Sequence, residues 1–167
     1  SRADEEEQIE KLLPIIRELS TQNLCLSVET YETKVAEACF DAGACMLNLT
    51  GNFGDKSLYQ TVADHEGAVI LCYVQGQHVR AVKDFNFTED NFKPMQDFFA
   101  KTIDFATQYG VKKILIDPGL GFYYSNLQDS VKRVRYQMET FLQTFRLRQL
   151  GFPVCHALPH AFDFFQD

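Results

Sequence analysis

The sequence has no long apolar run, no Cys-x-x-Cys pair and little positive charge. None of its 167 residues lies in a hydrophobic stretch near the ~20 residues that span a bilayer, which argues against a membrane protein. Residues 1–7 are acidic and do not resemble a secretory signal, so we expect a cytoplasmic protein. Sixteen Lys and Arg against 23 Asp and Glu give a net charge of −7, which argues against general nucleic-acid or anionic-membrane binding.

Several motifs of well-known chemistry are also missing. No Walker, G-x-S-x-G or H-E-x-x-H motif occurs, and the G-x-G at 119–121 does not extend to G-x-G-x-x-G because residue 124 is Tyr. The five cysteines are odd in number and widely spaced, which argues against a disulfide framework or a zinc knuckle. We interpret them as reduced, buried thiols. They are Cys25, Cys39, Cys45, Cys72 and Cys155.

What is present is an alternation of predicted strands and helices within one domain-sized chain that is 46% hydrophobic. The predicted helices cover residues 4–19, 33–42, 56–65, 90–109 and 126–149, and the predicted strands cover 24–30, 44–49, 68–74, 112–117 and 153–157. Such alternation indicates a parallel sheet with right-handed crossovers. It allows an open doubly wound sheet or part of a (β/α)₈ barrel, and five strands without further information favour the open sheet.

In both architectures ligands bind where the strands end, and three polar side chains stand there. Asp117 follows a buried strand and precedes Pro118 and Gly119, so its carboxylate could accept two N–H bonds from an amidine-like heterocycle; a turn or helix-cap Asp is the alternative. Glu29 is either a second ligand-binding carboxylate or a solvated strand end. Asn48 is either a ligand contact or an amide that caps a loop.

Two histidines bracket the end of the last predicted strand. His156 and His160 have metal-like spacing on a helix, but Pro159 lies between them, so packing or capping is the default interpretation and no metal site is predicted.

Three segments together resemble dihydropteroate synthase and its relatives, the pterin-binding family. They are Ser-Val-Glu-Thr-Tyr at 27–31, Asn-Leu-Thr-Gly at 48–51 and Asp-Pro-Gly-Leu-Gly-Phe at 117–122, in the family's order and over essentially the whole chain. The resemblance implies a (β/α)₈ TIM barrel of the pterin-binding type in place of the open sheet. It also implies that Glu29, Asn48 and Asp117 hold a pterin ring, with Gln75 and Tyr124 as secondary candidates.

The family condenses a hydroxymethyl-dihydropterin pyrophosphate with p-aminobenzoate in folate biosynthesis, so the resemblance implies such a transferase or a divergent relative. The alternatives are a pterin- or folate-binding module without synthase activity, such as a methyl-transferring relative, and a structural barrel segment. Glu29 stands where the family has Asp, and Leu49 where it has an acidic residue. Tyr123 and Tyr124 stand where it has Gly-Lys, and residues 157–161 where it has Ser-Arg-Lys.

The register of the resemblance matches residues 24–30 to the third barrel strand and 153–157 to the seventh. Residues 1–167 are therefore expected to form a partial pterin-binding domain of about five parallel strands, without the first two strands and the last. Those strands carry the family's anion-binding residues, so we expect the isolated chain to be inactive and any Mg²⁺ to be bound outside it. The expected partners are a small-molecule pterin and a second copy of the chain in a homodimer.

Overall fold

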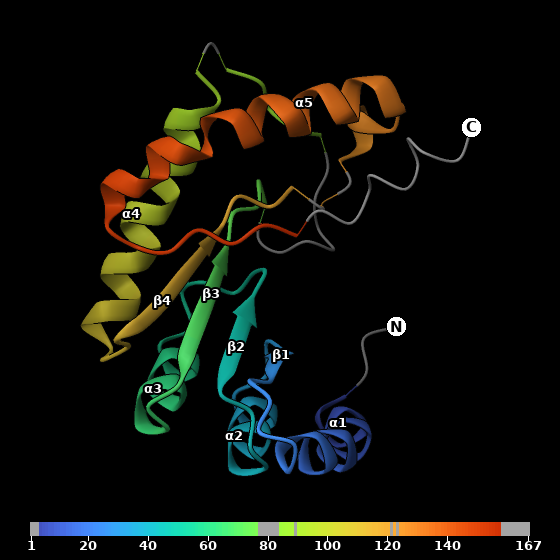
Figure 1. The fold of residues 1–167 in the computed structure, drawn as a ribbon, viewed down its shortest axis with the longest axis vertical. Helices are drawn as coiled ribbons and strands as arrows, with labels where there is room; N and C mark the ends of the chain where they lie inside the picture. The colour runs from blue at the N-terminus through green and yellow to red at the C-terminus, as the bar shows by residue number, and fades with distance from the viewer. Residues whose placement is uncertain (1–3, 77–83, 89, 121, 123, 158–167) are drawn as a thin grey trace.

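The computed structural model describes residues 4–76, 84–88, 90–120, 122 and 124–157. Strands and helices alternate along the chain, as the sequence predicts (Figure 1). Their order is α1 (Glu5–Ser20), β1 (Ser27–Glu29), α2 (Thr33–Asp41), β2 (Met46–Leu49), α3 (Lys56–Asp64), β3 (Ala68–Cys72), α4 (Phe92–Gln108), β4 (Lys113–Asp117), η2 (Ser125–Leu127), α5 (Ser130–Gln143) and η3 (Thr144–Leu150).

The four strands form one parallel sheet in the order β1-β2-β3-β4. The predicted fifth strand is present only as a parallel bridge between Val154 and Ile116 on the outer side of β4. Its hydrogen bonds run from Ile116 N to Pro153 O at 3.0 Å and from Cys155 N to Ile116 O at 3.0 Å. Residues 153–155 therefore continue the sheet in sequence order, although the pairing is shorter than the predicted strand 153–157.

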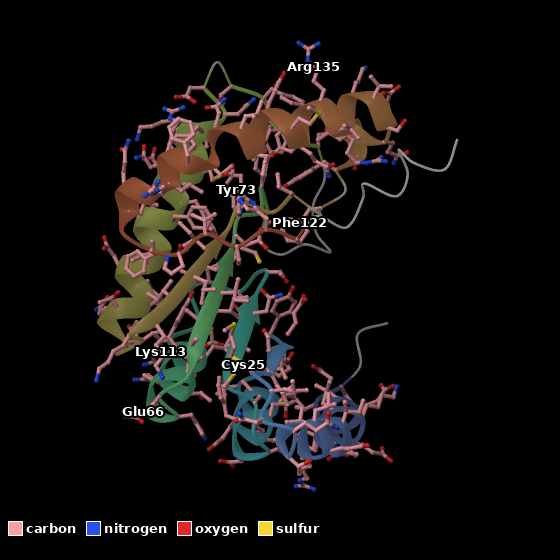
Figure 2. All side chains as sticks on the ribbon, in the orientation of Figure 1. Cys25, Glu66, Tyr73, Lys113, Phe122 and Arg135 are labelled. Atoms are coloured by element: carbon pink, nitrogen blue, oxygen red, sulfur yellow. The ribbon has the colours of Figure 1, made fainter. Side chains whose placement is uncertain are left out.

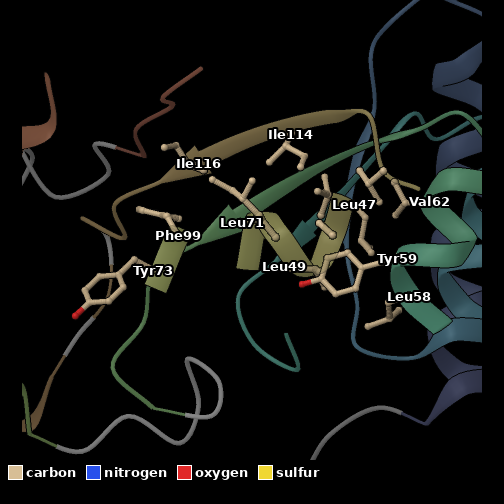
Figure 3. Close-up of a cluster of buried hydrophobic side chains, with 14 of the residues drawn as sticks. Leu47, Leu49, Leu58, Tyr59, Val62, Leu71, Tyr73, Phe99, Ile114 and Ile116 are labelled. Atoms are coloured by element: carbon tan, nitrogen blue, oxygen red, sulfur yellow. The ribbon is translucent and has the colours of Figure 1, made fainter. Parts of the chain in front are cut away.

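The two faces of the sheet differ in what covers them. Side chains alternate along a strand, and one face carries fully buried aliphatic residues that pack against α3 and α4 (Figure 3). Among them are Leu47 and Leu49 of β2, Leu71 of β3 and Ile116 of β4, each with 0% of its surface exposed. The opposite face is partly open: Ile70 and Leu115 are half-buried and Glu29 is exposed. A barrel strand has this same division between a helix-covered outside and an inside.

The open-sheet expectation from the strand pattern alone is wrong. A doubly wound sheet reverses its strand order at a switch point, whereas this sheet adds each strand next to the preceding one, including the Val154 bridge. Sequential addition with helices on one face is the arrangement of a barrel wall. The architecture is therefore that of a partial (β/α)₈ barrel with four parallel strands.

Two local predictions need correction. The predicted helix at 126–149 is divided into η2, α5 and η3, because Asp129 caps a new helix by accepting from Lys132 N at 2.9 Å. The expectation that all five thiols are buried holds for Cys39 and Cys72 but is wrong for Cys25, which is exposed. All five cysteines are free.

Helix α5 extends past the arrowheads of β3 and β4 in Figure 1. Its Gln137 donates a side-chain hydrogen bond to the carbonyl of Leu120, in the turn after β4. This places α5 near the end of the sheet at which the strands finish. Among the described residues, no helix has the length and hydrophobicity needed to cross a membrane.

Candidate functional site

The three principal candidates project from one face of the sheet, at the end where the strands finish. Glu29 and Asn48 are paired across β1 and β2, in a row that continues to Ile70 and Leu115. Asp117 lies two residues beyond Leu115 and therefore points to the same side. Figure 2 shows this end of the sheet near Tyr73 and Phe122, whereas Lys113 lies at the opposite end.

Glu29 is held by a side chain that directly follows the next strand, β2. The hydroxyl of Thr50 donates to Glu29 Oε1 at 2.7 Å, and the hydroxyl of Tyr31 lies 2.5 Å from the same Thr50 oxygen. Because the single Thr50 proton is used toward Glu29, Tyr31 is the donor to Thr50. This chain of hydrogen bonds fixes an exposed carboxylate beside Asn48, so Glu29 is more ordered than a freely solvated strand end.

Asp117 combines burial with a turn. Its side chain is buried, and Oδ1 accepts from the backbone N–H of Gly119 at 2.8 Å. Burial raises the pKa of the Asp117 carboxyl group, and the Gly119 N–H, the Cys72 side chain and the nearby His156 oppose that rise. The turn role considered from the sequence is therefore present, on a side chain that lies on the open face of the sheet.

Gly119 is required by the geometry of this turn. Its φ is +75°, and a Cβ atom built there would lie 2.2 Å from the carbonyl oxygen of Tyr73. Both the left-handed backbone and the close approach exclude other residues. The turn packs closely against the residue that follows β3, next to the point where Asp117 pairs with Cys72 in the sheet.

Asn48 is half-buried and contacts the neighbouring strand. Its Oδ1 accepts from the thiol of Cys72 at 3.3 Å. Asn48 Nδ2 makes no hydrogen bond to any residue that the structure describes. The amide is thus anchored through its oxygen, and its NH₂ group is left for another partner.

The secondary candidates Gln75 and Tyr124 lie in a network that joins the segments after β3 and β4. Gln75 Oε1 accepts from Asn86 N at 2.7 Å, and its Nε2 donates to Asn86 O and to the hydroxyl of Tyr73. Tyr124 is buried, and its hydroxyl accepts from Gln75 N at 3.3 Å. Burial raises its pKa to about 12. The structure thus brings these two together, with most of their polar groups occupied within the chain.

The segment after η3 adds two further groups near Asp117. Burial and the Asp117 charge raise the pKa of Cys155 to about 11. Burial lowers the pKa of His156, whose Nε2 lies 3.4 Å from the Thr144 hydroxyl. His160 lies outside the described residues. Within the described ranges no three His, Cys, Asp or Glu side chains converge as metal ligands would.

Sequence reasoning missed two residues that shape this site. Thr50 holds Glu29, and Cys72 bonds Asn48 and borders Asp117. Thr50 directly follows the Asn48 strand, and Cys72 ends the strand between the other two. Their positions at strand ends were the available signal.

Comparison with known proteins identifies the family of this chain. Residues 1–158 match the family model described as pterin binding enzyme. A dihydropteroate synthase of Streptococcus pyogenes is 30% identical over 152 residues, which are 89% of this chain and 51% of that protein. A crystal structure of Xanthomonas albilineans dihydropteroate synthase with 4-aminobenzoic acid superposes with a TM-score of 0.78 at 26% identity. It covers 100% of this chain and 58% of the other.

The chain belongs to the pterin-binding family and is related to dihydropteroate synthase. The barrel predicted from the resemblance is confirmed by the similarity to the X. albilineans structure. The chain spans about half the length of the curated relatives it matches.

Proposed function

We propose that the face carrying Glu29, Asn48 and Asp117 binds a pterin ring, as part of a protein of the dihydropteroate synthase type. The observation that carries the proposal is the placement of these three groups on one face at the finishing ends of β1, β2 and β4. A pterin is planar and carries adjacent ring and amino N–H donors on one edge. Asp117 is the group suited to that edge, because a buried carboxylate gains most from two charge-assisted hydrogen bonds.

The chemistry expected of the whole protein is condensation of a pterin pyrophosphate with an arylamine. The S. pyogenes and X. albilineans proteins bear the name dihydropteroate synthase, and the latter was crystallised with 4-aminobenzoic acid. In this chain Asp117 would orient the ring, and Glu29 with Asn48 would hold its other polar atoms. We propose, from the register of the family resemblance alone, that any Mg²⁺ of the reaction is bound by residues outside this chain.

A second function is favoured by specific departures from the family. Leu49 replaces an acidic residue beside Asn48, and Tyr124 lies where the family has Lys. Tyr124 is buried and bonded to Gln75, so it does not replace a mobile cation. These changes favour a module that binds a pterin or folate without synthase activity, such as a methyl-transferring relative.

The test is a ligand screen of the full-length protein that contains this chain, by isothermal titration with 6-hydroxymethylpterin, a folate and p-aminobenzoate. Pterin binding that p-aminobenzoate does not mimic supports the proposal. Folate binding without formation of dihydropteroate from pterin pyrophosphate and p-aminobenzoate favours the second function. Failure of every pterin and folate to bind at millimolar concentration would contradict both.

The proposal includes a second copy of the chain as partner. Val131, Met138 and Leu142 on α5 are 69%, 59% and 67% exposed. Their spacing of seven and four residues places them on one side of the helix. Exposed apolar side chains gathered on one side of a helix are typical of association surfaces.

A further inference from the structure

Cys72 occupies the centre of the candidate site. It is the last residue of β3, 3% exposed, and it is paired with Asp117 across the sheet. Asn48 lies on β2, the neighbouring strand on the opposite side of β3 from β4. It pairs with Ile70, which precedes Cys72 by two residues and lies on the same face of the sheet. The thiol therefore lies between two of the three groups proposed to bind the ring.

The thiol is a donor with two acceptors in reach. It donates to Asn48 Oδ1 at 3.3 Å, and the Asp117 carboxylate, its neighbour across the sheet, is a second acceptor to which the proton can turn. Burial, and secondly the Asp117 charge, raise the pKa of Cys72 far above its ordinary range, so the group keeps its proton at neutral pH. A thiol has one proton and can satisfy only one acceptor at a time. Asn48 and Asp117 are thus linked through a single S–H group.

The contact with Asn48 determines which end of that amide faces a ligand. With Oδ1 turned toward Cys72, the Nδ2 group is directed away from β3, and it bonds to no residue that the structure describes. Without a donor at position 72, rotation about the last side-chain bond of Asn48 would present either group. A ligand would then meet a mixture of orientations.

We propose that Cys72 is a positioning residue whose S–H group orients the Asn48 amide, so that the site selects a heterocycle offering an acceptor to Asn48 and donors to Asp117. The inference rests on the proposed pterin function and deepens it. When the ligand N–H groups occupy Asp117, the thiol proton is released fully to Asn48. Ligand binding at Asp117 therefore reinforces the orientation of Asn48.

The test uses Cys72→Ala, Cys72→Ser and the matched control Cys39→Ala. Cys39 is also a fully buried thiol, but it lies on α2, away from the strand ends. Cys72→Ala removes the donor, and we expect roughly three- to tenfold weaker binding of 6-hydroxymethylpterin. Cys72→Ser keeps an O–H donor and should bind within about twofold of the unaltered chain. Cys39→Ala should bind equally well although it leaves a similar cavity.

The pH profile separates positioning from packing. The groups that face Asp117 are Cys72 of β3, Cys155 and His156 of the segment after η3, and the Gly119 N–H; Glu29 of β1 acts on Cys72. Loss of the Cys72 donor raises the Asp117 pKa further, so the acid limb of the binding curve should move to higher pH in Cys72→Ala. It should not move in Cys39→Ala.

A ligand-free measurement keeps the inference distinct from the proposed function. In ¹⁵N spectra the Asn48 side-chain amide should give one sharp pair of signals in the unaltered chain and in Cys72→Ser. It should be broadened or doubled by rotation in Cys72→Ala. Unchanged Asn48 signals and unchanged affinity in Cys72→Ala overturn the inference, as does a Cys72→Ser variant that behaves like Cys72→Ala. Absence of pterin binding with the expected amide signals overturns the proposed function alone.

Discussion

The backbone N–H of Gly119 donates to Oδ1 of Asp117, two residues earlier, at 2.8 Å. This turn after β4 thereby holds a buried carboxylate at the end of the sheet. Because Gly119 also contacts the backbone of Tyr73, the same turn sets the spacing between β3 and β4 at the candidate site. Substitution of Asp117 should therefore test ligand binding, and substitution of Gly119 should test local stability.

Asp117→Asn should weaken pterin binding without unfolding the chain. The Asn side-chain oxygen can still accept from Gly119, but the charge that strengthens the ligand N–H bonds is lost. A charged hydrogen bond is worth about 1.5–3 kcal/mol, or roughly ten- to hundredfold in affinity. Titration calorimetry measures the loss, with Asp104→Asn on the exposed surface of α4 as control. Equal affinity of Asp117→Asn and the unaltered chain would remove Asp117 from the site.

Pterin affinity should also fall in acid, because the carboxylate form of Asp117 is the acceptor. Burial raises the Asp117 pKa, so protonation begins at a higher pH than for an exposed Asp. Affinity is full above the Asp117 pKa and is lost as the pH falls through it. Calorimetric titrations with the pterin from pH 4 to pH 8 check this. The loss of affinity in acid should be absent in Asp117→Asn. Affinity that does not change with pH in the unaltered chain would contradict the assignment of Asp117 as the acceptor.

Gly119→Ala should strongly lower the free energy of unfolding. Substitutions at two other glycines separate the cost of the left-handed backbone from the steric cost of the Cβ atom. Gly151 has φ +80° with nothing within 4 Å of a built Cβ, so Gly151→Ala reports the backbone cost alone, about 1–2 kcal/mol. Gly54→Ala has open space and should be nearly neutral. Gly119→Ala adds the 2.2 Å approach to Tyr73 O and should exceed Gly151→Ala. Chemical denaturation ranks the three; equal values for residues 119 and 151 would refute the steric argument.

His65, which lies away from the candidate site, should make the free energy of unfolding depend on pH. Its Nδ1 lies 2.8 Å from Thr61 O and its Nε2 lies 3.1 Å from Asp41 Oδ1, so both nitrogens donate when the ring is protonated. These partners, the Thr61 carbonyl first, raise the His65 pKa. The stabilisation by the protonated His65 ring is therefore complete below about pH 6.5, and it is lost as the pH rises through the pKa of His65 in the folded chain.

The His65 effect is small because Asp41 is 72% exposed. Asp41→Asn should cost about 0.2–1 kcal/mol at pH 5.5 and less at pH 8.5. Asp104→Asn is the control. A loss that is larger at pH 8.5 would mean that the protonated ring is not the stabilising form.

Self-association should have two separable sources. Among the described residues β1 pairs only with β2, so its other edge is available to a second chain, and Ser27→Lys should reduce higher oligomers. Leu142→Glu on α5 should instead convert a dimer to monomers. Thr107→Lys on the exposed side of α4 is the control. Size-exclusion chromatography with light scattering measures both, and a salt-insensitive monomer of the unaltered chain would contradict the two contacts.

Local patterns were sufficient for the order of elements and for most of their boundaries. The apolar spacing along α1 and the Asp4 cap, which accepts from Glu7 N at 2.8 Å, act within one turn of helix. Helices and strands of this kind are recognisable because their periodicity and end signals involve neighbouring residues. Asp117, Asn48 and Glu29 were predictable as strand-end residues for the same reason.

Contacts between distant segments decided the rest. The predicted strand 153–157 is reduced to a bridge at Val154, because a pairing partner determines how far a strand extends. The division of the predicted helix over 126–149 is local by contrast, since it follows the Asp129 cap. Only the register of three strands shows that Cys72 links Asn48 to Asp117, residues 24 and 45 positions away from it. Sequence patterns carry the alternation of each strand, whereas the alignment of one strand against the next is set by tertiary packing.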